Sequence, residues 1–321
     1  MKQMNRLKNF PINFLAVILG LTGFSLALQK AEQILNIPFS IFPLFLGISI
    51  ITGIAFTIIY TFKIIKFPKE AKEEFNHPIK MNFYPIIAKV LLILSIIFLP
   101  LDMSISKVLW ILGVISQLTF SIVIASSWIK HSKFQFKHLN PAWFIPIVGN
   151  LIVPIAGVAH GFIELSWFFF SIGFFMWLTL FIIVFNRMIF HHPIQEKLLP
   201  TLFILFAPPA IAFIAYVKLV GEIDIFAKMF FNFAIFLVIL IFAQVKLFLK
   251  IKFYISWWAY TFPVVAISIA TMLMYHETGS IFFNQLSWFF MILLSIIMVY
   301  VSYRTIKAIR CGHICVEEIT E

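Results

Sequence analysis

Ten long apolar stretches, each separated from the next by a short polar break, constrain the fold of this chain more than any other feature. About 20 predominantly apolar residues are enough for an α-helix to cross the hydrocarbon core of a bilayer. Only 12% of the 321 residues are charged, about half the share that is usual in a soluble domain. The sequence therefore predicts an all-α polytopic membrane protein. It argues against a soluble enzyme, a nucleic-acid-binding protein and a secreted disulfide-rich domain.

The polar residues that flank each stretch set the boundaries of the predicted spans. The spans run over Pro11–Leu28, Phe39–Phe62, Phe83–Pro100, Val108–Ile129, Trp143–Ala159, Leu165–Phe185, Leu199–Val217, Phe226–Phe248, Trp258–Tyr275 and Ile281–Tyr303. They divide the chain into an N-terminal segment (1–10), a transmembrane domain (11–305) and a C-terminal tail (306–321). The first span is predicted to remain uncleaved, because no clear small-x-small cleavage site follows it.

Basic residues fall almost entirely on one side of the predicted membrane. Of the 24 Lys and Arg residues, nineteen lie in the termini and in the alternate loops of that side, and four lie in loops of the other side. Because short loops rich in Lys and Arg stay in the cytoplasm, both termini are predicted to be cytoplasmic in a multi-pass protein of the plasma (inner) membrane. The longest loop, from Lys63 to Met81, is predicted to be a solvated cytoplasmic segment.

A repeat of about 60 residues separates the starts of the odd-numbered spans, which predicts five tandem helical hairpins. The positions of proline support this pattern. Prolines lie inside odd-numbered spans, whereas the even-numbered spans contain only Pro43, close to an end. A proline inside a membrane helix frees a carbonyl and bends the helix, which is tolerated beside packed protein or a water-filled cavity. We therefore expect kinks in five inner helices around a central pore, with the even helices facing lipid or a neighbouring subunit. The expected kinks are at Gly20, Pro85, Pro146, Gly149, Pro154, Pro208, Pro209 and Pro263.

The predicted spans contain almost no ionisable side chains. The absence of Asp and Glu from their interiors weakens a proton- or sodium-coupled mechanism, which commonly uses intramembrane carboxylates. Lys89 is the exception, and two interpretations remain open: an anion-attracting charge near the inner mouth of a pore, or a lysine that extends to the membrane interface without a role. Asn150 is a candidate polar residue of the pore lining.

No cofactor or metal site is predicted. The tail sequence Cys311-Gly312-His313-Ile314-Cys315 has two thiols and one imidazole, but their spacing matches no usual zinc pattern, so a solvated tail is favoured.

Three segments resemble the tellurite-resistance and dicarboxylate transporter family, which includes bacterial tellurite-resistance channel homologues and the plant slow-type anion channels. They are Asn140–Asn150 (NPAWFIPIVGN), Ala207–Ala210 (APPA) and Ser256–Pro263 (SWWAYTFP), in the family's order and at suitable positions in the spans. One departure lies in the first span, where the family often has Gly-x-Pro-Leu-Gly. Here the same stretch, Ala16–Gly20, retains only Gly20, so the first helix is expected to be straighter.

The resemblance implies five hairpins around a quasi-fivefold axis, and a homotrimer with one pore in each protomer. It further implies passive anion conduction through a pore that a phenylalanine of the ninth helix blocks. In this sequence that residue is Phe262, immediately before Pro263.

The leading functional hypothesis is a passive channel for small inorganic monovalent anions such as nitrate or chloride. The alternative is a secondary transporter that exports dicarboxylate, sulfite or tellurite-type oxyanions, since the same family includes such carriers. A membrane-embedded enzyme is not supported, because no catalytic constellation is present in the sequence.

Overall fold

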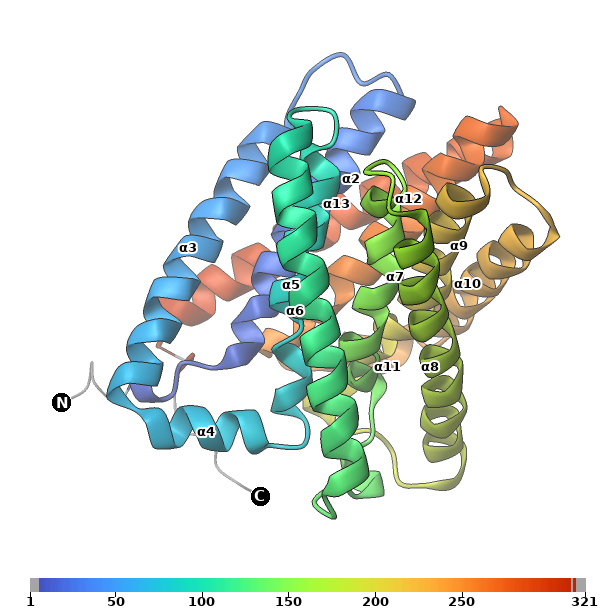
Figure 1. Cartoon of the computed structure of the whole chain (residues 1–321). Helices are drawn as coiled ribbons and strands as arrows, with labels where there is room; N and C mark the ends of the chain where they lie inside the picture. The colour runs from blue at the N-terminus through green and yellow to red at the C-terminus, as the bar shows by residue number, and fades with distance from the viewer. Residues whose placement is uncertain (1–5, 313, 316–321) are drawn as a thin grey trace.

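A computed structural model describes residues 6–312 and 314–315, and within these residues it contains helices and no strands (Figure 1). Nine helical stretches of this described part are long and apolar enough to cross a membrane, and a shorter apolar helix at Pro141–Gly157 makes a tenth. The predicted fold class is therefore confirmed. The ten α-helices of these crossings are α2 (Leu15–Ile34), α3 (Phe42–Lys66), α5 (Ile86–Phe98), α6 (Met103–Lys130), α7 (Ile145–Gly157), α8 (Ile163–Phe190), α9 (Ala207–Val220), α10 (Ile225–Ala243), α12 (Thr261–Thr278) and α13 (Ile281–Arg310).

Most helices end within a few residues of the predicted span ends, and α2 and α13 extend furthest beyond them. They continue to Ile34 and Arg310, past the predicted ends at Leu28 and Tyr303. The prediction stopped where the apolar run stops, whereas the helical hydrogen bonds continue past the first charged residues. A separate short helix, α11 (Val245–Leu249), follows α10.

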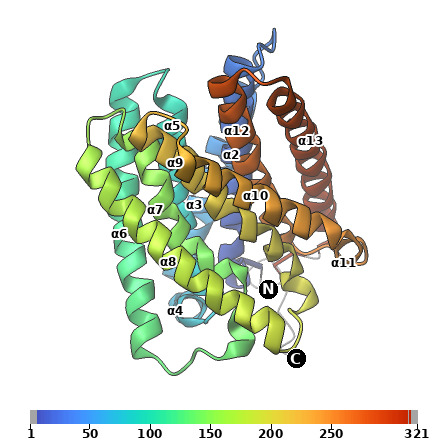
Figure 2. The same ribbon diagram turned by 90° about the vertical axis from the view of Figure 1, so that its right-hand side faces the viewer.

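Consecutive helices pair into five hairpins, as the repeat predicts. The pairs α2/α3, α5/α6, α7/α8, α9/α10 and α12/α13 pack along their lengths. Figures 1 and 2 show pairs such as α7/α8 and α9/α10 side by side in two views at right angles. Because each hairpin returns the chain to the same end of the bundle, the first helices of all five hairpins run parallel.

The two helices of each hairpin differ strongly in burial. In the most apolar 18-residue window of the spans that contain α2, α5, α9 and α12, 67–89% of the residues are buried, against 17–33% for α3, α6, α8, α10 and α13. In α7 only Ile155 is not buried. The odd helices are therefore the inner ones, and the even helices present an apolar outer surface that is suited to lipid.

The inner helices form a closed ring. Each of them packs against the next in the order α2, α5, α7, α9 and α12, and α12 packs against α2 again. The first and last hairpins of the chain therefore meet, and the five inner helices surround a common axis.

Glycines of three outer helices lie 60 residues apart and mark equivalent positions of the repeat. A Cβ built at Gly113 of α6 would lie 2.8 Å from Leu92 of α5, and one at Gly173 of α8 would lie 2.8 Å from Leu151 of α7. The third member, Gly53 of α3, is more loosely placed, with Ile18 of α2 at 3.6 Å. The absence of a side chain at Gly113 and Gly173 lets each outer helix approach its inner partner closely, which fixes the geometry of the hairpin.

A 3-10 helical segment precedes each inner α-helix and forms the start of that membrane crossing or leads into it. These segments are η1 (Ile12–Phe14), η2 (Lys80–Phe83), η4 (Pro141–Phe144), η5 (Glu196–Phe206) and η6 (Ile255–Tyr260). Their junctions with the α-helices explain the proline pattern. Pro85 directly precedes α5, while Pro146, Pro208, Pro209 and Pro263 occupy the first turns of α7, α9 and α12.

The structure corrects the predicted kinks accordingly. Among the six prolines of the prediction, only Pro154 lies in a helix interior; the others occupy positions where a missing N–H removes no helical hydrogen bond. Gly20 and Gly149 lie within α2 and α7, and both are sites of close helix contact, described below. Helix α2 itself is continuous from Leu15 to Ile34.

The segment between α3 and α5 is not a solvated loop. It forms a further helix, α4 (Pro68–Asn76), which lies across one end of the bundle (Figure 1). Ala71 and Glu74 of α4 are buried, whereas Lys69 and Lys72 are exposed. The prediction of a solvated loop was wrong for the face of α4 that points into the protein. The charges alternate along this segment, so the sequence does not show that one face of the helix is buried. We call this end of the bundle, where Arg6 and Cys315 also lie near each other, the terminal end.

Candidate functional site

The candidate site is the axis of the inner ring, and its best-defined wall is the start of α12. Trp258 is anchored there by its indole N–H, which donates a hydrogen bond to the Thr305 hydroxyl of α13 at 2.9 Å. The hydroxyl of Thr261 donates to the Trp258 carbonyl at 2.7 Å, joining η6 to α12. Thr261 and Pro263 are buried, but Phe262 between them is only half-buried. The backbone that carries Phe262 is thus held firmly, while its ring is not fully enclosed.

Two glycines of α2 bring that helix against the same part of α12. A Cβ built at Gly20 would lie 2.8 Å from the Trp258 ring, and one at Gly23 would lie 3.3 Å from the Phe262 ring. Gly20, which the sequence suggested as a kink, is therefore a position that allows α2 to pack closely against the start of α12. Phe262 faces α2 across the boundary between the last and first hairpins.

This contact predicts that Gly20→Ala destabilises the protein. The added methyl group would collide with Trp258 and Thr261, and such overpacking typically costs about 1–3 kcal/mol. Gly47→Ala is the matched control, because Gly47 is also helical but has open space where its Cβ would lie. Thermal unfolding of the detergent-solubilised protein should show a lower midpoint for Gly20→Ala only. The control should be neutral or slightly stabilised, since alanine favours helix over glycine by up to about 1 kcal/mol. Equal midpoints for the two variants would contradict the contact.

Lys89 of α5 lies inside the protein and is 2% exposed. The exposed face of α5 carries Ile87, with the half-buried Val90 and Leu94 beside it. Lys89 is two residues from Ile87, about 200° around a helix of 3.6 residues per turn, and so points away from that face. Since a lysine that extends to the lipid interface would need an exposed path, the observed burial favours the inward-facing interpretation.

Asn150 and Gly149 face the outer helix α6. The Asn150 amide donates to the Ser121 hydroxyl at 3.0 Å and to the Ile147 carbonyl at 2.9 Å, and Asn150 has no exposed surface. Gln117 of α6 donates to the Pro146 carbonyl at 2.7 Å and fills the space where a side chain at Gly149 would stand. Asn150 and Gly149 are therefore parts of a polar interface between α6 and α7.

The two ends of the inner ring differ in charge. The positive ends of five parallel helix dipoles meet at the terminal end. The segments that lead into the inner helices there carry Lys80, Lys137, Lys197 and Lys252. The acidic residues of the five inner α-helices, Glu32 and Glu277, both lie in last turns at the opposite end.

A buried polar group at the terminal end, which we call the Glu74 cluster, could not be recognised from the sequence. The Glu74 carboxylate of α4 accepts hydrogen bonds from the Ile12 backbone N–H and the Tyr60 hydroxyl, both at 2.9 Å, and from the Lys63 ammonium at 2.6 Å. Lys63 also donates to the Phe10 carbonyl at 2.7 Å. The cluster therefore ties α4 and the end of α3 to the start of inner helix α2. The three residues that donate to the Glu74 carboxylate are 11, 14 and 62 positions away in sequence, so no local pattern identifies them.

Neither a metal nor a cofactor can be assigned. The described residues contain no group of three or more His, Cys, Asp or Glu side chains that could hold a metal ion. In the tail motif, Cys311 is exposed and Cys315 is half-buried, while His313 lies outside the described residues.

A closed ring of buried parallel helices, surrounded by helices with apolar outer faces, defines a polytopic membrane protein of the channel or transporter class. The sequence model of the voltage-dependent anion channel family matches residues 9–306. The chain belongs to this family, which confirms the resemblance.

Three relatives illustrate the range of the family. An uncharacterized transporter of Methanocaldococcus jannaschii is 26% identical, and the alignment covers 98% of each chain. An S-type anion channel of Arabidopsis thaliana is 31% identical over 83% of this chain, which spans about half (53%) of the length of that plant protein. A tellurite resistance protein homologue of Haemophilus influenzae is 24% identical over 85% of this chain and 84% of its own length. Family membership thus supports anion transport across a membrane as the general function.

Proposed function

We propose that the protein is a passive channel that conducts small monovalent anions such as nitrate or chloride along the axis of the inner ring. The observation that carries this proposal is a closed ring of five parallel helices whose acidic residues, Glu32 and Glu277, lie only in last turns. Such a path contains no carboxylate at membrane depth to bind and couple a cation. Its weak sites, built from helix dipoles and a distant basic surface, favour rapid permeation over tight binding.

In the proposed channel the Phe262 ring closes the pore, because a bulky apolar side chain in a narrow apolar path can close it by dewetting. Lys89 attracts anions from the inner wall. We further propose that the terminal end is cytoplasmic, in a plasma (inner) membrane, because it carries most of the basic residues. The apolar outer helices are compatible with the homotrimer that the family resemblance implies.

Reconstitution into liposomes tests the proposal. Purified protein should give an anion current that reverses at the Nernst potential of the permeant anion and does not shift with a pH gradient. The alternative is a secondary transporter of dicarboxylate, sulfite or tellurite-type oxyanions. It is favoured by the names of two relatives, the uncharacterized transporter of Methanocaldococcus jannaschii and the tellurite resistance protein homologue of Haemophilus influenzae. A reversal potential that shifts with the pH gradient would support this alternative and contradict the channel.

Lys89 gives a more specific prediction. Lys89→Met keeps the length of the side chain but removes its charge, so it should lower unit anion conductance at least about twofold through the lost charge–anion attraction. Lys130→Met removes an exposed charge at the end of the outer helix α6 and serves as the control. Single-channel recordings in planar bilayers would measure both. Unchanged conductance in Lys89→Met, or an equal reduction in Lys130→Met, would remove Lys89 from the pore wall.

A further inference from the structure

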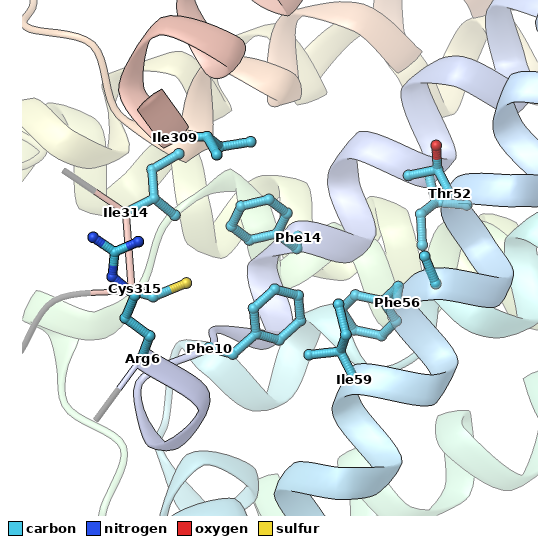
Figure 3. Close-up of a pocket in the computed structure, with 11 residues that line it drawn as sticks. Arg6, Phe10, Phe14, Thr52, Phe56, Ile59, Ile309, Ile314 and Cys315 are labelled. Atoms are coloured by element: carbon cyan, nitrogen blue, oxygen red, sulfur yellow. The ribbon is translucent and has the colours of Figure 1, made fainter. Parts of the chain in front are cut away.

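A groove of about 290 Å³ lies on the outer surface at the terminal end, where the first hairpin meets the last (Figure 3). Helix α3 forms one wall, the end of α13 and the residues after it form the other, and the start of α2 forms the floor. Figure 3 shows Arg6 and Cys315 at one end of the groove and Thr52 at the other. Its apolar lining includes Phe14, Ile18, Ala55, Phe56, Ile59 and Ile309.

The groove exists because no loop joins the first and last hairpins. Helix α13 packs against α2, but within the described residues α3 and α13 are not among the helix pairs that pack extensively. The α3 residues that line the groove run from Thr52 to Ile59, which lie 14 and 7 positions before Lys66, the last residue of α3. The groove therefore covers about 10 Å of α3 and reaches about 20 Å from its terminal end. It therefore runs from the membrane interface toward the middle of the bilayer.

An aliphatic chain is the occupant that these walls fit. The groove is lined almost entirely by apolar side chains, so water would find too few hydrogen-bond partners there. An empty groove would deprive its lining of dispersion contacts. An acyl chain that moves from the bilayer into an apolar groove gains no hydrophobic free energy, because both surroundings are apolar. Any preference for one lipid over another must therefore come from its headgroup.

The charged end of the groove indicates which headgroup binds. Arg6 is exposed and forms no ion pair with the described residues, whereas Lys8 is paired with Glu70 at 3.3 Å and Lys63 with Glu74 at 2.6 Å. A guanidinium can bind a phosphate group through two parallel hydrogen bonds.

The thiol beside Arg6 adds no negative charge. Burial raises the pKa of Cys315, so its thiol remains neutral at pH 7. We propose that the groove binds an anionic membrane phospholipid, with one acyl chain against Phe56 and Ile59 and with the headgroup phosphate on Arg6.

A bound lipid would support the helix that faces the gate. Ile18 of α2 lines the groove, while Gly20 and Gly23 of the same helix contact Trp258 and Phe262 of α12. An occupied groove therefore holds α2 in the position that closes the ring at Phe262. This second consequence rests on the proposed channel function, whereas lipid binding does not.

Native mass spectrometry of the full-length protein tests binding without any measurement of transport. Protein in detergent is incubated with equal amounts of phosphatidylglycerol and phosphatidylcholine, and the retained lipids are counted. The wild type should retain phosphatidylglycerol preferentially. Arg6→Gln should lower that retention about fivefold, the factor that corresponds to about 1 kcal/mol for one basic residue near an anionic membrane surface. The control Lys130→Gln removes an exposed charge at the end of α6, on another hairpin, and should change nothing.

A second variant tests the groove itself. Ala55→Phe places a ring in the space of the acyl chain and should abolish selective retention, whereas Ile51→Phe, on an exposed part of α3 outside the groove, should not. Equal retention of the two lipids by the wild type, or wild-type retention by Arg6→Gln or Ala55→Phe, would overturn the proposal. Anion current in vesicles with and without phosphatidylglycerol then tests the coupling to the gate separately. A protein that retains the lipid but carries no current would contradict the channel function and leave the lipid site intact.

Discussion

Replacement of Phe262 by alanine is expected to raise the anion current about tenfold or more. Phe262 is the half-buried side chain between the buried Thr261 and Pro263, and its ring contacts the Gly23 position of α2. Removal of the ring would leave space beside the axis that can stay hydrated, so the dewetting barrier falls. Each 1.4 kcal/mol or so removed from the barrier multiplies the rate by about ten. The current, corrected for the amount of reconstituted protein, would be measured in liposomes or oocytes.

A graded series makes this prediction sharper. Phe262→Leu should give a current between those of the parent and Phe262→Ala, because leucine fills only part of the space of the ring. Phe168→Ala is the control, since Phe168 lies on the outer helix α8 and is 51% exposed. Equal currents in Phe262→Ala and the parent protein, or an equal rise in Phe168→Ala, would show that Phe262 is not the gate.

The order of the elements could be predicted from the sequence because hydropathy is a local property. Membrane crossing requires about 20 consecutive apolar residues, and such runs are visible without knowledge of their neighbours. The distinction between inner and outer helices was also predictable, although the physical reason differed. Prolines such as Pro85 and Pro263 identify the inner helices because they occupy the junctions between 3-10 and α-helical segments.

The contacts across the fold could not be predicted in this way. Gly149 is explained by Gln117 of a different helix, and Gly20 by Trp258, which is 238 positions later in the chain. Phe262 was identified only through its resemblance to a family motif, since 41 phenylalanines offer no local means of selecting one. Glu74 was assigned to a solvated loop because its charged neighbours resemble a hydrated segment, whereas three long-range partners stabilise its buried carboxylate.

Glu74→Gln is expected to destabilise the protein strongly. Glu74 and Lys63 are 7% and 3% exposed, and loss of the carboxylate would leave the Lys63 ammonium buried without a counter-charge. Breaking such a buried pair by removing one partner typically costs about 3–5 kcal/mol. The change would also weaken the attachment of α4 to the Ile12 backbone N–H, at the start of the first inner helix. Thermal unfolding followed by tryptophan fluorescence should show a midpoint that is roughly 6–20 °C lower, on the scaling known for domains of 150–250 residues.

The matched control lies on the same helix. Glu70 of α4 pairs with Lys8 at 3.3 Å, but the two side chains are 30% and 39% exposed. Exposed pairs contribute only about 0–1 kcal/mol, so Glu70→Gln should shift the midpoint little. High salt should reduce the effect of Glu70→Gln further while leaving that of Glu74→Gln almost unchanged, because screening acts mainly on exposed charges. If both variants shift the midpoint equally, the Glu74 cluster does not hold α4 to the inner ring. A large shift for Glu74→Gln alone would show that a helix outside the ring stabilises the start of α2.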